Sequence, residues 1–279
     1  MAGKSDYSKK QKSVDEWHRR NSLFWNDIYK RKDLCAFLIQ QRHFTALNYI
    51  KDLSFPEGTN ALEVGCGAGF MAIALAKAGF MVTAIDSLHE MTTLSQKNAR
   101  DAGVDNKIDA VLGDVHGLAF QDQSFGLVVA LGVTPWLFSL RKALVEIARV
   151  LVPGGHVVLQ ASNLYHLNRM LDPLLTPAFE PFRKSVKHGL ERAGLYKPSK
   201  KPEAQYFSPK NFKSHLRVAN LANVRDTTIG FGPFTLLGHR ILPDWMAYRV
   251  HQKLQQYADS GFPILRMTGF EYIVLAKKM

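Results

Sequence analysis

Residues 61–70, Ala61-Leu62-Glu63-Val64-Gly65-Cys66-Gly67-Ala68-Gly69-Phe70, place three glycines between a short apolar run and a helical pattern. The run 61–64 predicts a buried strand, and residues 70–77 predict a helix. A glycine loop at such a junction lets a ligand approach the backbone at the carboxyl edge of a sheet, beside a helix N-terminus. This stretch therefore predicts a ligand site in an α/β fold.

The spacing of these glycines argues against two kinds of phosphate site. A dinucleotide fold needs Gly-x-Gly-x-x-Gly, whereas Gly67 and Gly69 are two positions apart, and the acidic Glu63 precedes the loop. A Walker-type loop needs Gly-Lys-Ser/Thr, which does not follow here. Neither a pyrophosphate ligand nor a nucleoside triphosphate is indicated.

Strand and helix patterns alternate on both sides of the loop. This alternation predicts a parallel sheet with helices on both faces. Further strands are expected at 81–85, 108–112, 125–131 and 156–161, with helices at 88–102 and 140–150. Beyond residue 162 we expect helices at 164–175, 179–193, 209–220 and 244–258, strands at 224–229 and 272–276, and a basic loop at 196–202.

Four motifs resemble those of the class I S-adenosylmethionine-dependent methyltransferase family, in the family's order. Residues 61–70 are similar to its first motif, and Thr83-Ala84-Ile85-Asp86-Ser87 to the end of its second strand. Gly113-Asp114-Val115 stands in the adenine-binding position, and residues 147–156 are similar to the turn before strand five. The resemblance covers about residues 58–162. It implies a Rossmann-like, seven-stranded, mostly parallel sheet with a final antiparallel strand at 272–276, and S-adenosylmethionine as cofactor.

The resemblance also implies roles for single residues. Asp86 would accept hydrogen bonds from both ribose hydroxyls, and Asp114 would accept one from the adenine amino group. A helix N-cap is the alternative for Asp86, and an Asx-turn for Asp114. Arg42 would pair either with the cofactor carboxylate or in a surface ion pair. The residues expected at the cofactor are Glu63, Gly65, Cys66, Gly67, Gly69, Asp86, Ser87, Met91, Asp114, Val115 and Leu131.

Two departures from related patterns restrict the chemistry. Phe125-Gly126 stands where the family usually has Phe-Asp, so a carboxylate that commonly braces the neighbouring backbone is missing, and local rigidity is in question. After strand four the chain reads Leu131-Gly132-Val133-Thr134-Pro135-Trp136, without the Asn/Asp-Pro-Pro-Tyr/Phe motif of amine methylation or an acidic residue for a catechol-type metal site. We therefore expect metal-independent methyl transfer.

Composition and charge bound the kind of protein. A chain of 279 residues with 46% hydrophobic content can bury one substantial core. Cys35 and Cys66 are expected to be free thiols in a reducing, cytoplasmic compartment, and no apolar stretch reaches the length of a membrane span. The net charge of +12 is uneven, with a balance of −2 over residues 60–160 and +7 over residues 163–217. The basic segment suits an acidic substrate, anionic lipid, nucleic acid or a solvated surface.

The expected organisation has three parts. Residues 1–12 are expected to be a disordered tail, and 13–57 a set of two or three helices that form a lid. Residues 58–279 form the methyltransferase domain, with cap insertions at about 163–207 and 231–269.

The acceptor is expected beneath the lid and the cap. Tyr165 and His166 follow the fifth strand, so they are the first candidates for contact with the acceptor or its proton, with packing at a helix start as the alternative. Trp17, Phe24 and Trp25 would either close over the site or belong to the core. Weaker catalytic candidates are His18, Tyr29, Tyr206 and His239.

The sequence favours an enzyme that methylates a small-molecule or lipid-like acceptor. RNA is the alternative acceptor, although no separate RNA-binding module is recognisable and the binding of RNA would weaken steeply with salt. Two further alternatives are a non-catalytic cofactor-binding scaffold of the same fold and a peripheral membrane enzyme with a basic amphipathic surface at 164–195. The oligomeric state is left open.

Overall fold

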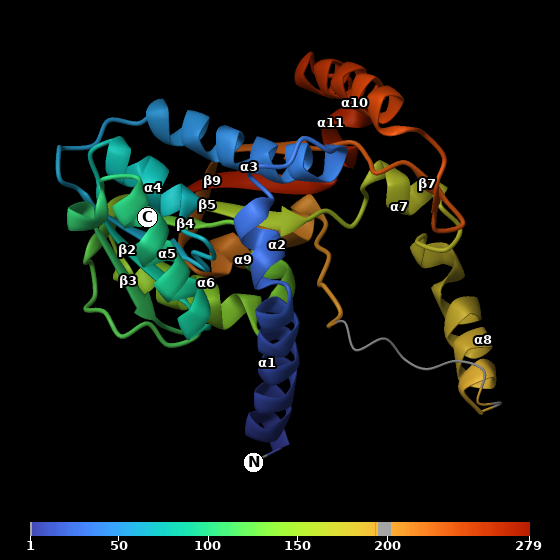
Figure 1. Cartoon of the computed structure of the whole chain (residues 1–279), viewed down its shortest axis with the longest axis horizontal. Helices are drawn as coiled ribbons and strands as arrows, with labels where there is room; N and C mark the ends of the chain where they lie inside the picture. The colour runs from blue at the N-terminus through green and yellow to red at the C-terminus, as the bar shows by residue number, and fades with distance from the viewer. Residues whose placement is uncertain (1, 193, 195–201) are drawn as a thin grey trace.

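A computed structural model describes residues 2–192, 194 and 202–279, and it shows one seven-stranded sheet with helices on both faces (Figure 1). The strand order is β3-β2-β1-β4-β5-β9-β6. Strands β1 to β5 pair in parallel, and β9 is antiparallel to both β5 and β6. The strands are β1 (Asn60–Val64), β2 (Met81–Asp86), β3 (Ile108–Leu112), β4 (Phe125–Ala130), β5 (Leu151–Ser162), β6 (Leu221–Ile229) and β9 (Glu271–Lys278). The predicted fold class is confirmed, including the antiparallel last strand.

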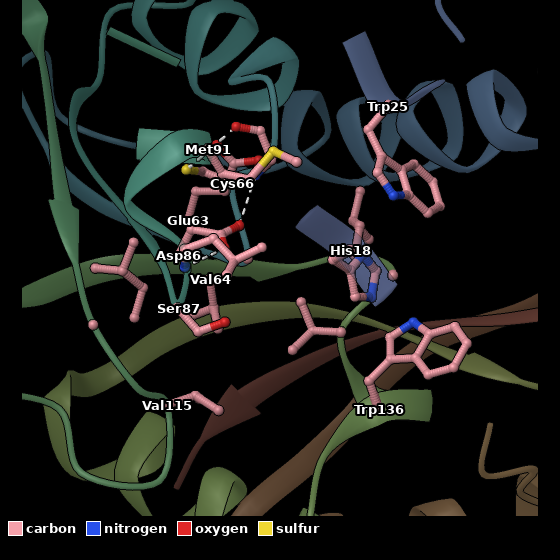
Figure 2. A pocket seen from close by; sticks show the side chains of 18 of the residues that line it. His18, Trp25, Glu63, Val64, Cys66, Asp86, Ser87, Met91, Val115 and Trp136 are labelled. Atoms are coloured by element: carbon pink, nitrogen blue, oxygen red, sulfur yellow. Dashed lines mark hydrogen bonds between the residues drawn. The ribbon is translucent and has the colours of Figure 1, made fainter. Parts of the chain in front are cut away.

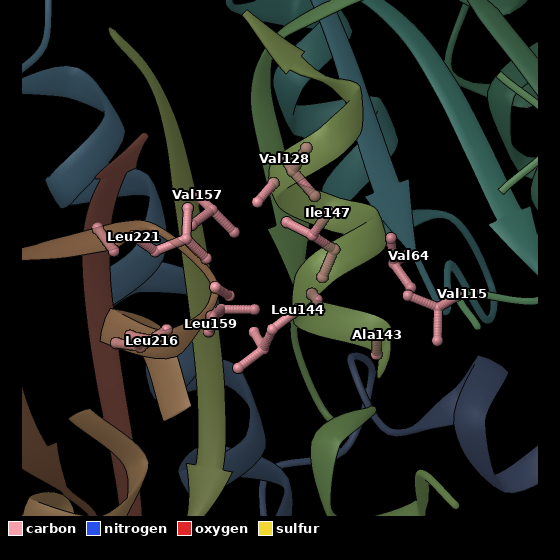
Figure 3. Packing of buried hydrophobic residues seen from close by; sticks show 14 of the residues in the cluster. Val64, Val115, Val128, Ala143, Leu144, Ile147, Val157, Leu159, Leu216 and Leu221 are labelled. Carbon is pink, nitrogen blue, oxygen red and sulfur yellow. The ribbon is translucent and has the colours of Figure 1, made fainter. Parts of the chain in front are cut away.

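One face of the sheet is covered by α6 (Leu140–Val150) and α9 (Pro209–Val218). Val128 and Val157 of the sheet pack towards Leu144 and Ile147 of α6, and all four side chains are fully buried (Figure 3). Burial of a Leu or Ile side chain contributes about 2 kcal/mol each. The apolar positions of α6 recur at helical spacing, which is why its bounds could be predicted correctly.

The opposite face is covered by α3 (Leu34–Lys51), α4 (Phe70–Lys77) and α5 (His89–Asp101). Met71 and Leu75 of α4 and Tyr49 of α3 pack against the buried β1 and β4 residues on this side. The first strand therefore has apolar neighbours on both faces, as an interior parallel strand requires.

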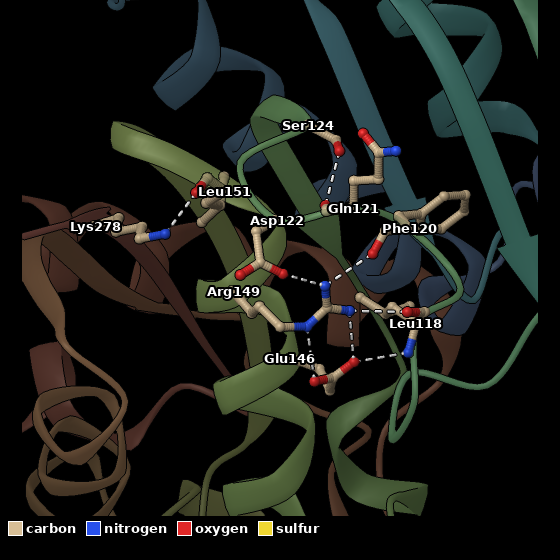
Figure 4. A network of polar contacts seen from close by, with 9 residues as sticks. All are labelled: Leu118, Phe120, Gln121, Asp122, Ser124, Glu146, Arg149, Leu151 and Lys278. Atoms are coloured by element: carbon tan, nitrogen blue, oxygen red, sulfur yellow. Dashed lines mark hydrogen bonds and ion pairs between the residues drawn. The ribbon is translucent and has the colours of Figure 1, made fainter.

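Arg149 of α6 fixes the loop that leads into β4 (Figure 4). Its Nη1 donates to the Phe120 carbonyl at 2.8 Å and to Asp122 at 2.7 Å, and its Nη2 donates to the Leu118 carbonyl at 2.8 Å. A Cβ at position 126 would lie 2.7 Å from Thr59 Cγ2, so packing favours the glycine. The arginine braces the backbone in this region, which answers the question of rigidity raised by the missing carboxylate.

The N-terminal region differs from the predicted disordered tail, and this prediction is wrong for the described residues. Helix α1 runs over Ala2–Arg20, and α2 over Ser22–Asp27. The buried Val14 anchors α1 on the body of the protein. Because residues 4–20 contain neither proline nor glycine, the helix can extend from this anchor towards the N-terminus. Figure 1 shows α1 projecting away from the sheet. The two or three helices predicted for 13–57 are present as α1, α2 and α3.

The cap differs from prediction in detail. Helix α7 (Leu167–Leu171) is shorter than the predicted 164–175, because Asp172 precedes Pro173 and the residue before a proline disfavours helical geometry. The hairpin of β7 (Thr235–Leu236) and β8 (His239–Arg240) and the short α11 (Leu265–Thr268) were not predicted. Of the predicted basic loop at 196–202, residues 196–201 lie outside the described residues. The other cap elements are α8 (Glu180–Arg192), α10 (Asp244–Asp259) and a 3-10 turn at Pro177–Phe179; further 3-10 turns occupy Asp105–Lys107 and Thr134–Trp136.

Within the described part of the chain, no helix has the length and apolar character needed to cross a bilayer. Both cysteines are free, as predicted.

Candidate cofactor and acceptor site

A cavity lies at the carboxyl ends of β1, β2 and β4, between the glycine loop and the N-terminal helices. This is the edge where ligands bind in open α/β sheets. Its lining includes all the predicted cofactor residues except Gly69, namely Glu63, Gly65, Cys66, Gly67, Asp86, Ser87, Met91, Asp114, Val115 and Leu131. The structure thus brings together residues from three separate motifs.

The glycines of the loop have two different tasks. All three have positive φ angles, 71° at Gly65, 51° at Gly67 and 80° at Gly69, which favour glycine. No atom lies within 4 Å of the position that a Cβ would take at Gly67, which lines the cavity. At Gly69 a Cβ would lie 2.3 Å from Ser95 Oγ. Gly67 therefore leaves room for a ligand, whereas Gly69 allows α5 to pack against the loop.

Asp86 holds the loop in place (Figure 2). Its Oδ2 accepts from the Gly67 backbone N–H at 3.0 Å, and its Oδ1 accepts from the Leu88 N–H at 3.0 Å. Burial raises the pKa of this carboxyl, against the lowering effect of these two hydrogen bonds. A carboxylate offers about four lone-pair sites, so capacity remains for ligand hydroxyls. The helix N-cap predicted as the alternative for Asp86 is wrong, because Leu88 is the N-cap of α5 and no side chain caps that helix; Asp86 braces the glycine loop instead.

Glu63 is a buried acid whose second oxygen has no partner. The side chain is only 6% exposed, and Oε2 has no hydrogen bond to any described residue. Burial raises the pKa of Glu63 well above its usual value, and the nearby Asp86 carboxylate adds to the increase. An unsatisfied buried acceptor at a cavity wall is costly unless a ligand donates to it. The site therefore fits a ligand that carries a donor or a positive charge here.

Asp114 and His116 form a rigid turn beside Val115. Asp114 Oδ1 accepts from the His116 backbone N–H at 2.9 Å and lies 2.7 Å from His116 Nδ1. The backbone N–H of Ser139 donates to His116 Nε2 at 3.3 Å, so the proton of the neutral ring is on Nδ1 and points at Asp114. The Asx-turn predicted as an alternative is present, and Val115 is held against the cavity.

Helix α1 supplies a wall that sequence reasoning did not assign to the cofactor side. Gln11, Val14 and His18 line the cavity. Ser87 Oγ donates to Asp15 Oδ1 at 3.0 Å, and Arg19 lies 2.7 Å from Glu90. These contacts join residues more than 70 positions apart in the chain, and no local pattern in the sequence signals them.

Aromatic rings form the outer part of the cavity (Figure 2). The His18 ring stacks on Trp25 with centroids 5.7 Å apart and meets Trp136 edge-on at 5.5 Å. Trp25 Nε1 is buried without a partner among the described residues. Burial lowers the pKa of His18 to about 4, so the ring is neutral at pH 7. Trp17 stacks on Trp136 with centroids 5.3 Å apart, and Phe24 meets Trp25 edge-on at 5.1 Å; among the described residues that line the cavity, Trp17 and Phe24 are absent.

Arg42 is largely enclosed and pairs with a buried acid, so the alternative of a surface ion pair is wrong. Its Nη1 lies 3.5 Å from Glu271 Oε1, and the two side chains are 11% and 6% exposed. Burial raises the pKa of Glu271 to about 6 despite this neighbour. Arg42 also lines the cavity beside Gly132, where a Cβ would lie 3.0 Å from Nη1. A buried guanidinium at this wall suits an anionic ligand group.

Tyr165 and His166 are absent from the lining of the cavity formed by the described residues, so the cavity gives no support to the prediction that they contact the acceptor. Tyr165 is 45% exposed. His166 is the N-cap of α7, where Nδ1 accepts from the Arg169 N–H at 3.2 Å, and its ring packs on Tyr206 and Phe270. The packing alternative describes His166, whereas Tyr165 is exposed where the chain turns from β5 into the cap. Of the weaker candidates, His18 and Tyr29 line the cavity, whereas Tyr206 and His239 are absent from this lining.

Residues 62–159 match the family model described as "Methyltransferase domain". A malonyl-[acyl-carrier protein] O-methyltransferase from Erwinia billingiae is 34% identical over 45% of this chain and 51% of its own length. A demethylmenaquinone methyltransferase from Lactobacillus johnsonii is 28% identical over 66% of this chain and 76% of its own. The chain thus spans about half the length of the first of these relatives.

Among solved structures, magnesium protoporphyrin IX methyltransferase from Synechocystis, with bound SAH, superposes with a TM-score of 0.63. The match covers 97% of this chain and 100% of the other, at 14% identity. At this identity the likeness concerns the fold, and it extends over the N-terminal helices and the cap as well as the sheet.

Proposed function

We propose that this chain, which belongs to the class I S-adenosylmethionine-dependent methyltransferases, transfers the cofactor's methyl group to a small-molecule acceptor. Bound S-adenosylmethionine supplies a methyl group that is already electrophilic. The protein's contribution is then to align the acceptor and to exclude water. The observation that carries the proposal is the bracing of the cavity-facing glycine loop by Asp86.

The described residues fit the cofactor at three points. The Asp86 carboxylate would accept from the ribose hydroxyls, and the unpaired Glu63 Oε2 would accept from the amino group of the methionine part. Arg42 would meet its carboxylate, since the guanidinium lines the same cavity. Asp114 and Val115 would contact the adenine ring.

The acceptor, we infer, is an apolar molecule with a ring and an oxygen. The walls formed by His18, Trp25 and Trp136 favour a flat apolar group, and the free indole N–H of Trp25 favours an acceptor oxygen. The neutral His18 would accept a hydrogen bond from a hydroxyl. The names of two similar proteins, a demethylmenaquinone methyltransferase and, in fold, a magnesium protoporphyrin IX methyltransferase, agree with an acceptor of this kind. The proposed transfer uses no metal ion, because the segment directly after β4 has no acidic residue that could bind one.

The N-terminal helices would act as the lid. Helix α1 closes one wall through the Ser87–Asp15 and Arg19–Glu90 contacts, all of which are polar and at the surface. Such exposed contacts are worth about 1 kcal/mol or less each, so the cost of releasing the helix would come mainly from exposing the buried Val14 and separating Trp17 from Trp136.

Calorimetric titration with S-adenosylhomocysteine tests the cofactor site. Asp86→Ala should weaken the binding of S-adenosylhomocysteine by at least about tenfold. The variant loses the two hydrogen bonds that hold the loop and also the carboxylate that would accept from the ribose hydroxyls. Asp101→Ala at the exposed C-terminal end of α5 is the matched control and should bind like the parent. Absence of binding in folded, ligand-free parent protein would contradict the proposal and favour a scaffold; binding would be followed by transfer assays with labelled cofactor.

A further inference from the structure

We propose that Gln11 of helix α1 forms a hydrogen bond with the nucleoside part of the bound cofactor, so that cofactor binding holds α1 against the sheet. The inference rests on the proposed function, since it needs S-adenosylmethionine in the cavity. It adds a cofactor contact from outside residues 62–159, the part of the chain that matches the family model. Asp15 is a positioning residue in this proposal, because it holds Gln11 and is not among the described residues that line the cavity.

One face of α1 lies along the cavity. Gln11, Val14 and His18 line it, and their spacings of three and four residues place them on the same side of a helix. His18 belongs to the aromatic wall, where its ring stacks on Trp25. The helix rises by about 10 Å from Gln11 to His18. Gln11 therefore meets the cavity about two turns away from the wall proposed for the acceptor.

Asp15 joins Gln11 to the end of β2. Its Oδ1 accepts from Gln11 Nε2 at 2.8 Å and from Ser87 Oγ at 3.0 Å. A carboxamide has one oxygen acceptor and two N–H donors, so the bond to Asp15 fixes which end of the Gln11 side chain is the oxygen. Within the described chain, Gln11 Oε1 accepts no hydrogen bond. The side chain thus brings an oriented, available acceptor to the cavity.

Charge at this end of the cavity favours a neutral hydrogen-bond donor as the partner of Gln11. Burial raises the pKa of the Asp86 carboxyl, and the negative charge of Asp15 adds to this increase. Arg19, one turn further along α1, pairs with Glu90, and neither aspartate forms an ion pair with a described residue. An anionic group such as the cofactor's carboxylate would be repelled here, whereas hydroxyl and amino groups can donate to the oxygens. The nucleoside carries such groups.

Calorimetric titration of the full chain with S-adenosylhomocysteine and with methylthioadenosine tests this contact. Methylthioadenosine contains the same nucleoside and lacks the amino-acid part. Gln11→Ala should weaken the binding of both ligands by about fivefold, the equivalent of one net hydrogen bond. The same substitution should have an effect of less than about twofold when Asp15 is already replaced by alanine, because the carboxamide is then no longer held towards the ligand.

Glu16→Ala is the matched control, because Glu16 is exposed on α1 and is not among the described residues that line the cavity. It removes the same charge from the same helix as Asp15→Ala, and it should bind both ligands like the parent. A loss confined to S-adenosylhomocysteine would place the contact on the amino-acid part and overturn the proposal, as would equal affinities of Gln11→Ala and the parent. If the folded parent bound neither ligand, the proposed function would fail, and this inference with it.

Trypsin cleavage after Lys12 tests, separately from affinity, whether the cofactor holds α1. Lys12 follows Gln11 and is exposed within the helix, so the protease can cut there only when the helix opens locally. Saturating S-adenosylhomocysteine should slow this cleavage by at least about fivefold in the parent and by a smaller factor in Gln11→Ala. An unchanged cleavage rate in a parent that binds the ligand would overturn the proposal and leave the proposed function intact.

Discussion

The region around the glycine loop and the cap differ in what their carboxylates support. Around the glycine loop, Asp86 and Asp114 are each held by backbone N–H groups, and apolar side chains such as Val115 are buried. In the cap, Asp172 is held in the same way, but the structure that it supports presents Leu236 and Leu237 to solvent. In both regions a carboxylate accepts hydrogen bonds within a turn. In one region the turn forms a cavity wall, and in the other it supports exposed apolar side chains.

This difference indicates where binding partners meet the protein. A small ligand is enclosed by fixed polar groups at a sheet edge, whereas an extended partner needs an exposed surface. Three further experiments test whether the two regions differ in this way.

The largest effect is expected from Gly69→Ala in the cofactor half. The added methyl would lie 2.3 Å from Ser95 Oγ and 3.0 Å from Ser95 Cα, at a φ of 80°. Overpacking and left-handed strain together should lower the free energy of unfolding by about 3 kcal/mol, measured by urea denaturation.

Gly67→Ala is the comparison for that variant. No atom lies within 4 Å of its Cβ position, so it should lose only about 1 kcal/mol from its positive φ while binding S-adenosylhomocysteine more weakly. Equal losses of stability in the two variants would show that α5 does not pack tightly on the loop.

An intermediate effect is expected from His166→Asn in the cap, and it depends on pH. Burial lowers the pKa of His166 from 6.5 to about 4, so the unfolded chain binds a proton more readily than the folded one. The stability associated with the neutral ring is present above pH 6.5 and is lost as the pH falls towards 4. Between pH 8 and pH 5 the parent should lose about 2 kcal/mol more than the variant, whose asparagine can still cap α7.

Denaturation of both proteins at the two pH values measures this difference. Identical pH dependence in parent and variant would mean that His166 accepts a proton in the folded protein. It would then no longer be a packing residue, and a catalytic role for it would be open again.

The smallest effect is expected from Trp25→Phe in the aromatic wall. Phenylalanine keeps a ring but removes the buried N–H that has no partner among the described residues. The free energy of unfolding should stay the same or rise by up to about 1 kcal/mol, since the penalty for the unpaired donor disappears. Affinity for S-adenosylhomocysteine should not change. Trp245→Phe, at a 61% exposed position, is the control; a loss of about 2 kcal/mol in Trp25→Phe alone would reveal a partner for the indole.

Much of the cofactor half could be predicted because its signals are local. The strand 108–112 and the helices 70–77 and 140–150 have the predicted bounds, since periodicity and turn residues act over a few positions. Ten of the eleven predicted cofactor residues line one cavity, because the carboxyl ends of neighbouring parallel strands meet at one edge. Sequence patterns predicted the cap less well. Helix α7 ends before Pro173, short of its predicted end. The β7–β8 hairpin was not predicted, because strands of two residues are too short to show a periodic pattern.

Local patterns in the sequence were enough to predict the α/β fold and the residues that gather at one cavity beside the glycine loop. Packing in three dimensions brings α1 and Trp136 to the cavity lining and leaves Tyr165 and His166 outside the lining formed by the described residues. It also brings Arg42 beside the buried Glu271 and ties α8 to the turn at Pro173. The physical reason is range: backbone preference and side-chain periodicity act between near neighbours, whereas contacts such as Asp15 with Ser87 join segments that only the packed sheet brings together.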